Sequence, residues 1–598
     1  MVRTVGAAGG YWLADDWRYR FGRIGVFPFV FTNYFRIYAG NFWPAQFFLF
    51  HMVTTVVAPN SFGFAVLVGM VLQGIATALV YLLLRRLFGA RPMVGLLLLW
   101  FAFTILTLDS ADWVTVAYYM MPFQIALAGL ALLFLRYLDR PSRAGVASIV
   151  AAELLALCWY EKAVFIPFAL FALGAWFPVA SAGPIGARRA WREHRQLWGF
   201  LSLALALYAV LYLALDAVGF TTPGGSSPAA KLGQDLTFTA LALKSIIVSV
   251  FGGPWRWTSA SAVAKVTPQL LEANPPLSLA VLAFVLFAVL VVWTSTHRRA
   301  ARAAWLCLGV YLLAQVVLLA YGRVGVWGPA LGRYYLYFAD AAIPVTLALA
   351  FALLPTRSEH AVAARTEGPA RWPRFLQFGA YLALATVFLV GVGVSSAGEL
   401  SAWASNPGRS YVTNARASLG IAAHTPLILQ SAPPKVLSPL FAALNTTQVI
   451  LAPLPEHPKF QRIVDDHLFA VDPSGHIGPA HIVGWQSLGG PVPGCGWAIT
   501  APRASIPLNG SAFAWSWYVQ VHYHASSTVL ALVLFGKGSL LLRFNPGTHD
   551  VSFPITGGAN SLEITGARPD AGLCVASVSV GNLGVEVLPP GHARSSQH

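Results

Sequence analysis

Charged residues are scarce in this sequence. Asp, Glu, Lys and Arg make up only 10% of its 598 residues, whereas a soluble domain carries about 25%. Hydrophobic residues account for 57%, and the mean hydropathy is +0.63. The shortage of charge excludes an ordinary soluble globular protein, and the excess of apolar residues indicates a polytopic membrane protein.

Acidic residues are scarcer than basic ones. The sequence has 23 Asp and Glu and 39 Lys and Arg, which gives a formal net charge of +16. A nucleic-acid-binding protein can have such a balance. Here, however, the basic residues stand in short clusters between apolar runs, which is the pattern of cytoplasmic loops. We therefore interpret the charge as a sign of membrane topology and expect no nucleic-acid partner.

Cysteine is rare, with four in the whole chain. Cys158 and Cys307 lie in apolar runs, where a thiol behaves as a small hydrophobic group. Cys495 and Cys574 lie near the C-terminus and would close a loop of about 80 residues. We predict a disulfide between them in an oxidising compartment; two unrelated buried thiols are the alternative.

The chain does not open with a signal peptide, because its first residues lack a charged start followed by an apolar core.

Ten later apolar runs are long enough to span a membrane. They cover residues 63–84, 92–108, 117–135, 144–160, 163–180, 198–217, 277–295, 303–321, 335–354 and 375–396.

Arginine clusters follow every second run, beginning with Arg85, Arg86 and Arg91. By the positive-inside rule these loops are cytoplasmic. Residues 1–62 and everything after Ser396 then face the other side, which predicts a multi-pass cell-membrane protein with an extracytoplasmic C-terminal domain. An outer N-terminus requires either a short tail that translocates unaided or, as we favour, a helix upstream of the printed start.

We expect four regions along the chain. An outer loop and surface helices (1–62) precede an α-helical transmembrane domain (63–396), and residues 237–253 form a surface helix or a further span. A mixed α/β segment (397–480) contains turn signals such as "DPSG". Short alternating strands at 481–590, among them "WSWYVQVHYH" and "TVLALVLF", predict a β-sandwich of jelly-roll type.

Ionisable residues gather at the predicted outer ends of the helices, where they are costly unless they are paired, solvated or functional. There a carboxylate can act as a general base toward a hydroxyl, and Arg or Lys can stabilise a departing phosphate. One base opposite the leaving group gives inversion at a sugar carbon. The candidates are Asp15, Asp16, Asp109, Asp112, Glu161, Lys162, Arg323 and Arg333, with Arg36 and His51 weaker.

Four short motifs, "ADDW" (14–17), "LDSADW" (108–113), "WYEKAVFIP" (159–167) and "GRYYLYF" (332–338), resemble those of GT-C membrane glycosyltransferases. The resemblance implies an inverting transferase that uses a polyprenyl-phosphate sugar and a cell-envelope glycan, glycolipid or protein acceptor. It implies Asp15 or Asp16 as the base. The substrate-binding residues that we predict are Asp109, Asp112, Glu161, Lys162, Arg323, Arg333 and Tyr334. The arrangement is similar to that of actinobacterial transferases, and the composition suggests a GC-rich bacterium.

Other readings stay open at this point. Asp15, Asp16, Asp109 and Asp112 can cap helices, and Lys162 can extend toward the headgroups. Paired acidic motifs can hold Mg²⁺ or Mn²⁺, although no metal is required by the chemistry. Trp497, Trp515, Trp517 and Tyr518 can stack on sugars or fill a core. A transporter or flippase of lipid-linked sugar is the alternative function.

Overall fold

A computed structural model describes most of the chain in two compact units, residues 1–406 and 407–598, which are treated separately. The described residues are 2–20, 34–35, 41–179, 185–216, 228–261, 267, 269–357, 359, 374–422, 425–439, 444–500, 503–566 and 572–587.

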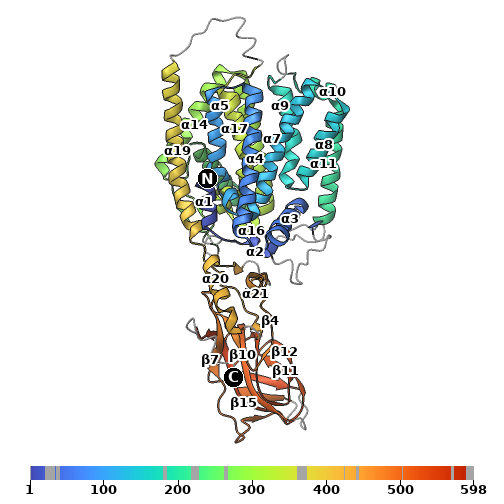
Figure 1. The fold of residues 1–598 in the computed structure, drawn as a ribbon, viewed down its shortest axis with the longest axis vertical. Coiled ribbons are helices and arrows are strands. Elements are labelled where there is room, and N and C mark those ends of the chain that lie inside the picture. The colour runs from blue at the N-terminus through green and yellow to red at the C-terminus, as the bar shows by residue number, and fades with distance from the viewer. Residues whose placement is uncertain are drawn as a thin grey trace. The chain divides into compact units, whose positions relative to one another are not determined.

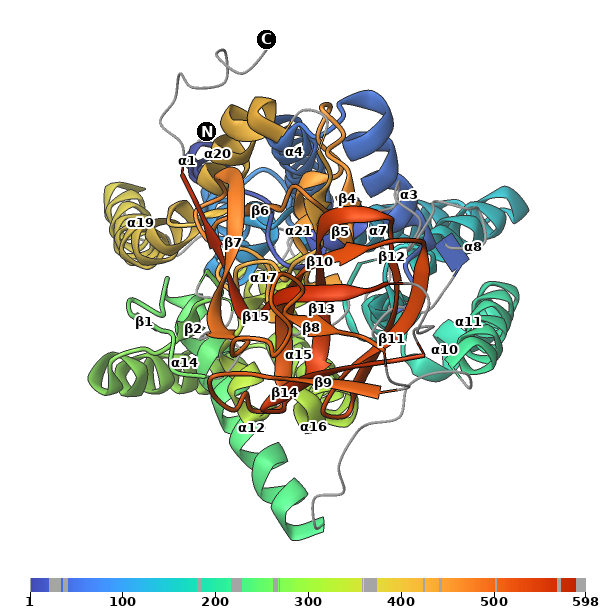
Figure 2. The same ribbon diagram turned by 90° about the horizontal axis from the view of Figure 1, so that it is seen from below.

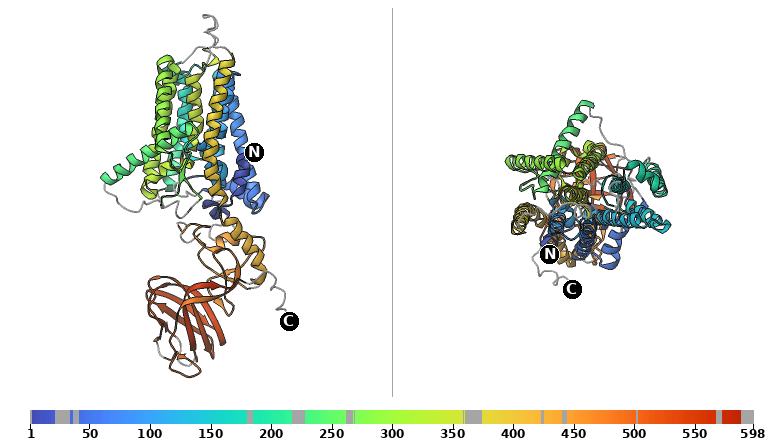
Figure 3. Two further views of the ribbon diagram at one scale, coloured as in Figure 1. Left: turned by 90° about the vertical axis from the view of Figure 1, so that its left-hand side faces the viewer. Right: turned by 90° about the horizontal axis from the view of Figure 1, so that it is seen from above.

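The first unit is a bundle of apolar helices (Figures 1 and 3). Within the described residues, six stretches are long and apolar enough to cross a membrane. This confirms a membrane helical region. Their helices are α4 (Phe62–Phe88), α7 (Val114–Asp139), α11 (Arg195–Asp216), α14 (Leu277–His297), α15 (Arg299–Leu319) and α19 (Arg374–Ala404).

The other four predicted spans also coincide with helices, but with shorter ones. At 1.5 Å per residue, a helix of 12 residues reaches roughly 18 Å, less than the 30 Å of a hydrocarbon core. The count of ten spans therefore stays a prediction. These helices are α5 (Pro92–Phe103), α8 (Arg143–Leu157), α9 (Ile166–Trp176) and α17 (Ala342–Leu353), with the short α10 (Ala187–Glu193) after α9.

Short elements connect the long helices at the end that bears the candidate residues. The predicted surface helix at 41–57 is α3, which continues into a π-helical turn, and the buried Gln46 and Phe50 pack it against the bundle. Residues 237–253 fall mostly in α12, which is not among the candidate spans. The short elements are α1 (Val2–Gly9), α2 (Asp15–Arg20), α3 (Pro44–His51), α6 (Asp109–Asp112), β1 (Trp257–Thr258), β2 (Glu272–Ala273) and α16 (Gly325–Trp327), and the longer α12 covers Pro228–Val250.

The second unit begins with the expected mixture of helices and short strands. Since α19 continues past Ser396 to Ala404, this mixture starts later than the predicted boundary at residue 397. The two parallel pairs β3–β4 and β3–β6 lie at one end of a larger sheet, which continues into the strands described below. Its elements are α20 (Gly408–Ser418), β3 (Leu427–Ile428), α21 (Thr447–Leu451), β4 (Phe460–Gln461), β5 (Val464–Asp465) and β6 (Phe469–Val471).

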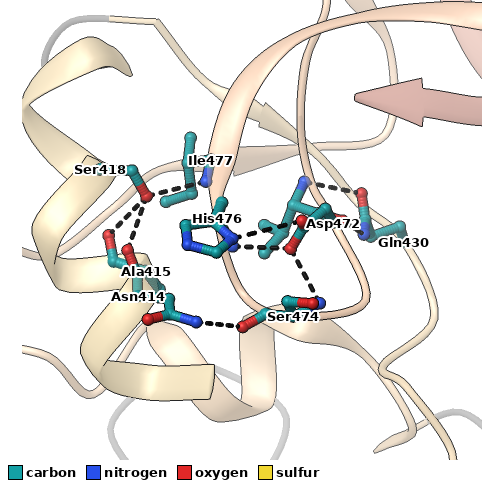
Figure 4. A network of polar contacts seen from close by, with 9 residues as sticks. Asn414, Ala415, Ser418, Gln430, Asp472, Ser474, His476 and Ile477 are labelled. Atoms are coloured by element: carbon teal, nitrogen blue, oxygen red, sulfur yellow. Dashed lines mark hydrogen bonds and ion pairs between the residues drawn. The ribbon is translucent and has the colours of Figure 1, made fainter. Parts of the chain in front are cut away.

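The "DPSG" turn between β6 and β7 is held by side-chain hydrogen bonds (Figure 4). The Asp472 carboxylate accepts the backbone N–H groups of Ser474 and His476, each at 2.8 Å. Asn414 of α20 donates to the Ser474 carbonyl, and Ser418 accepts the N–H of Ile477. These bonds fix α20 against the start of β7, so the turn predicted from the sequence also joins the helix to the sheet.

Two antiparallel sheets face each other in the rest of the second unit (Figure 2). One contains β7, β15, β10 and β13 side by side, and the other has the order β12-β11-β14-β9. The chain passes from one sheet to the other between β9 and β10, β10 and β11, β12 and β13, β13 and β14, and β14 and β15, whereas β11 and β12 form a hairpin within one sheet. A β domain is therefore confirmed, and its jelly-roll type stays a prediction. The strands are β7 (Ile477–Gln486), β8 (Trp497–Ala498), β9 (Arg503–Pro507), β10 (Trp515–Ala525), β11 (Val529–Phe535), β12 (Gly538–Phe544), β13 (Gly547–Gly557), β14 (Ser561–Thr565) and β15 (Cys574–Val585).

Alternation along the strands produces the core of this sandwich. Val519 and Val521 of β10 are paired in register with Phe553 and Val551 of β13, and all four are fully buried. On β10 the exposed His522 follows Val521, whereas Ser552 of β13 is buried between Val551 and Phe553. Because side chains alternate along a strand, the spacing predicts most of the residues that fill the core.

The predicted disulfide between Cys495 and Cys574 is present, whereas Cys158 and Cys307 are free. We expect the double variant Cys495→Ser/Cys574→Ser to lower the free energy of unfolding of the second unit by about 2–4 kcal/mol, because a cross-link restricts the unfolded chain. Denaturant-dependent proteolysis of the sandwich within the full-length protein measures the change.

The matched control is Cys158→Ser/Cys307→Ser, which leaves the cross-link in place. Added reductant is expected to destabilise the sandwich in this control and in the wild type, and to have no effect in the Cys495→Ser/Cys574→Ser variant. Equal stability of the sandwich with and without reductant in the wild type would contradict the prediction.

Candidate functional site

Aromatic packing holds the "ADDW" segment in the first unit. Trp12 and Trp17 are fully buried, and the Trp12 ring packs edge-on against Phe62 of α4 at 5.1 Å between centroids. Ala14 has φ +46°, a left-handed conformation that is uncommon for a residue other than glycine. The turn at Ala14 starts α2 and places Asp15 and Asp16 in its first turn, so a strained backbone position lies next to both candidate bases.

Asp16 is fully buried, and its carboxylate accepts hydrogen bonds at the start of another helix, α7. Its Oδ1 atom accepts the backbone N–H of Thr115 at 2.8 Å and the Thr115 hydroxyl at 2.5 Å, while Oδ2 accepts the N–H of Leu13 at 3.0 Å. Burial raises the pKa of Asp16 to about 7, although these donors favour the ionised form. The arrangement favours the structural reading of Asp16, as a cap for α7 supplied by a distant segment.

We expect Asp16→Ala to lower the free energy of unfolding by about 1–3 kcal/mol, because three buried donors lose their acceptor. Thr115→Val removes only the hydroxyl donor and should cost less. A double-mutant cycle in mixed micelles measures the coupling between these two side chains. Additive effects of the two substitutions would show that the Thr115 hydroxyl does not hold Asp16, and unchanged stability of Asp16→Ala would show that Asp16 does not cap α7.

Asp15 has a different environment from Asp16. It is half-buried, and its charge and that of Arg323 both act on the hydroxyl of Tyr337. Burial raises the pKa of Tyr337, Arg323 opposes this rise and Asp15 adds to it. Arg323 also donates to Asn41 Oδ1 at 3.0 Å. The fold therefore brings a carboxylate, a guanidinium and a phenol together from segments about 300 residues apart.

Glu161 lies near the same group. Its Oε2 atom accepts the Trp43 indole N–H at 2.6 Å, and the Trp43 ring stacks on Tyr119 with centroids 4.8 Å apart. Burial raises the pKa of Glu161, and the hydrogen bond from Trp43 and the charges of Arg323 and Lys162 oppose the rise. Glu161 is half-buried and held in one orientation. We call Asp15, Asn41, Glu161, Arg323 and Tyr337 the outer carboxylate site.

Lys162 points away from this site into the bundle. Its ammonium group lies 2.7 Å from Asp340 Oδ1, donates to the Tyr337 carbonyl at 2.9 Å, and has a side chain only 3% exposed. The Tyr311 hydroxyl donates to the other oxygen of Asp340. Since the charge of Lys162 is already paired and buried, the geometry favours a structural role over contact with a phosphate.

Asp109 and Asp112 belong to a second acidic cluster, with Glu399 of α19. The Asp109 carboxylate accepts the N–H of Leu336 at 2.8 Å. Asp112 and Glu399 line the same cavity, and both oxygens of the buried Asp112 carboxylate lack a hydrogen-bond partner among the described residues. Burial raises the pKa of both aspartates, that of Asp112 against the attraction of Arg3. Trp113, Gln269, Leu270 and Trp403 complete a cavity of about 10 Å³ with these three carboxyls, room for roughly one water.

No group of three or more His, Cys, Asp or Glu side chains within the described part of the chain has a metal-binding arrangement. The three carboxyls of the acidic cavity therefore do not form such a set, and Arg3, buried beside them, carries an opposing charge. The possible Mg²⁺ or Mn²⁺ site has no support from these residues.

Arg333 and Tyr334 lie in a third cluster, beside the β1–β2 hairpin. Arg333 Nη1 is 3.4 Å from Glu272 Oε2, and the Tyr334 hydroxyl is 3.4 Å from Oε1 of the same carboxylate. Ser261 binds both partners, through its N–H to Glu272 and its hydroxyl to Tyr334. The predicted phosphate residues Arg323 and Arg333 therefore fall into separate groups of contacts.

The residues that sequence reasoning missed are the partners of those that it found. Asp340, Glu272, Glu399 and Arg3 each stand alone in the sequence, with no motif around them. Tyr337 lies inside the quoted "GRYYLYF", but only Arg333 and Tyr334, in the first half of this motif, were predicted as site residues. Arg36 lies outside the described residues, and His51 stands at the last position of α3.

The four aromatic candidates of the sandwich also differ in how far the fold exposes them. Trp517 is 5% exposed and Trp497 packs against the core, whereas Trp515 is 60% exposed. Tyr518 packs against a smaller cluster that includes Val464 and Ile482. Only Trp515 of these four presents most of its ring for contact with another molecule.

The fold and the clusters described above define a membrane protein with a helical bundle and a sandwich domain. No protein-family model, curated protein or solved structure matches the chain. The GT-C resemblance therefore stays a hypothesis that depends on the four motifs.

Proposed function

We propose that the protein is an inverting, polyprenyl-phosphate-sugar-dependent glycosyltransferase. The observation that supports this most is that the half-buried Asp15 carboxylate and the Arg323 guanidinium both lie near enough to Tyr337 for their charges to shift the pKa of its hydroxyl in opposite directions. A base for a hydroxyl acceptor and a cation for a departing phosphate are the two groups that such a transfer requires.

In the proposed reaction, Asp15 takes the proton of the acceptor hydroxyl as its oxygen forms a bond to the anomeric carbon. The bond between that carbon and the phosphate oxygen breaks on the opposite face, and the electron pair leaves with the polyprenyl phosphate. Arg323 stabilises the additional negative charge on this phosphate. A single displacement of this kind inverts the anomeric centre.

The other residues of the outer carboxylate site position the reacting groups. Asn41 orients the Arg323 guanidinium through its 3.0 Å hydrogen bond. Trp43 fixes Glu161, whose second oxygen is suited to accept a hydrogen bond from a sugar hydroxyl. Asp16 and Lys162 support the site from within the bundle, the first by capping α7 and the second by pairing with Asp340.

The proposal also includes the number of membrane spans and the orientation of the protein in the membrane. Ten spans place the outer carboxylate site and the second unit on the extracytoplasmic face, where a polyprenyl-linked donor and a cell-envelope glycan, glycolipid or protein acceptor meet. The charge alternation of the loops supports this orientation. We infer an actinobacterial envelope enzyme from the motifs and the composition.

A reconstituted assay tests the proposal. Vesicles containing the full-length protein are given polyprenyl-phosphate sugars labelled in the sugar, a panel of pentoses and hexoses, with delipidated envelope glycans as acceptors. We expect label to become covalently attached to glycan with inverted anomeric configuration. Movement of donor across the bilayer without covalent transfer would instead support a transporter or flippase and contradict the proposal.

A further inference from the structure

The β1–β2 hairpin lies beside α12 and α14 (Figure 2), and a group of cations belongs to these elements and their neighbours. Lys244 comes from α12, Arg256 directly precedes β1, and Arg333 ends the 3-10 turn Pro329–Arg333. Glu272 of β2 supplies the carboxylate of this group. We call these four residues the interfacial basic cluster.

Backbone contacts fix the positions of the three cations. At Gly332, an added Cβ atom would lie 2.6 Å from the Phe238 carbonyl, so α12 approaches the 3-10 turn closely. The hydroxyl of Ser245, the neighbour of Lys244, donates to the Gly332 carbonyl at 2.9 Å. Lys244 and Arg333 thus stand on adjacent residues of two elements in direct contact.

Arg256 joins the cluster through the hairpin. Its Nε donates to the Asn274 carbonyl at 3.1 Å, and its own carbonyl accepts the Asn274 N–H at 3.0 Å. Asn274 is two residues from Glu272, which is paired in register with Thr258. Arg256 is exposed, and Lys244 is half-buried.

The charges of this cluster do not balance. Three cations face one carboxylate, and that carboxylate pairs with Arg333, whose side chain is 31% exposed. Burial lowers the pKa of Lys244, and the charges of Arg333 and Arg256 lower it further. Like charges at the edge of an apolar bundle repel, and an anion bound between them removes this cost.

The surroundings of the cluster favour an anion that is carried on a lipid. The candidate span α14 begins at Leu277, three residues after Asn274, and Leu277 is 75% exposed. Leu243, next to Lys244, is also exposed. Headgroup phosphates meet hydrocarbon at such a position, and basic pockets of membrane proteins bind them there.

We propose that Lys244, Arg256 and Arg333 form a binding site for the phosphate of a membrane lipid, whose hydrocarbon chain lies along the exposed face of α14. Glu272 holds Arg333 in place and limits the net charge of the site. The proposal does not depend on glycosyl transfer, because it concerns a group of contacts separate from the outer carboxylate site.

Native mass spectrometry of the full-length protein tests this site with three probes. They are a C55 polyprenyl phosphate, phosphatidylglycerol, and the C55 polyprenol, which lacks a phosphate. Lys244→Gln/Arg256→Gln leaves the Arg333–Glu272 pair intact and is expected to weaken phosphatidylglycerol binding by roughly tenfold or more. Polyprenyl phosphate should lose its binding at this cluster and keep that at Arg323. Polyprenol binding should not change. A preference for one phosphate lipid in the wild type identifies the natural source of the phosphate.

The matched control is Lys231→Gln, a substitution on the same helix at a lysine that lies over the Tyr321 ring. It should leave binding unchanged. Glu272→Gln removes the negative charge and is expected to tighten binding severalfold, an effect that misfolding does not produce. Wild-type affinity of the Lys244→Gln/Arg256→Gln variant, or an equal loss in Lys231→Gln, would overturn the proposal.

Discussion

Replacing Asp15 by Asn should reduce sugar transfer by at least about 100-fold while leaving the protein folded. A positioned general base contributes roughly 10²–10⁴ to a rate, and an amide of the same shape cannot accept the acceptor's proton. The loss should appear in kcat, since Asn retains the contacts that bind neutral sugar hydroxyls. Transfer from a labelled polyprenyl-phosphate sugar, with thermal unfolding of the same sample, measures both properties.

The matched control for this substitution is Asp139→Asn, which removes another carboxylate of the helical unit, one that pairs with Arg86. Its transfer rate should equal that of the wild type. Asp15→Glu should retain part of the activity, because the base remains but is displaced. Wild-type kcat in Asp15→Asn would remove Asp15 from the proposed reaction and with it the main support for the enzyme.

Replacing Lys162 by Met should lower the free energy of unfolding by about 3–5 kcal/mol, the cost of leaving a buried charge without its partner. Asp340 is fully buried, and only the Tyr311 hydroxyl among its described partners would remain near its oxygens. Reversible unfolding in mixed micelles measures this change. The exposed pair Arg189–Glu193 offers a matched control, and Arg189→Met should cost less than about 1 kcal/mol.

The double variant Lys162→Met/Asp340→Asn should recover much of the lost stability, because it removes both charges together. Such a recovery separates the penalty of an unpaired charge from the loss of packing. If Lys162→Met costs no more than Arg189→Met, the pair is not desolvated in the membrane and Lys162 is available for other contacts.

Apolar runs and strand alternation predicted most of the elements. The two quoted strand segments, "WSWYVQVHYH" and "TVLALVLF", both occur, as β10 and β11, because the alternation of buried and exposed side chains is visible in neighbouring residues. Each of the ten apolar runs coincides with a helix. Their lengths were less predictable: α8 stops at Leu157 and α9 starts only at Ile166, after a 3-10 turn at Glu161–Phe165, so both helices are shorter than the predicted runs 144–160 and 163–180.

The candidate site was predictable only in part. Local motifs identified the adjacent pairs Asp15–Asp16 and Glu161–Lys162, but the two residues of each pair lie in different environments. Asp16 and Lys162 turn into the bundle, whereas Asp15 and Glu161 stay half-buried. Which member of each pair is enclosed depends on partners such as Thr115 and Asp340, which lie about 100 and 180 residues away. No local pattern in the sequence encodes that choice.

The central claim is that Asp15 and Arg323 lie on opposite sides of the reacting carbon. A cryo-electron microscopy structure of the full-length protein with a non-transferable polyprenyl-phosphonate sugar tests it most directly. We predict that the phosphonate contacts Arg323 and that the anomeric carbon lies between it and Asp15. Phosphonate bound away from Arg323, at the interfacial basic cluster for example, with the sugar distant from Asp15, would contradict the account.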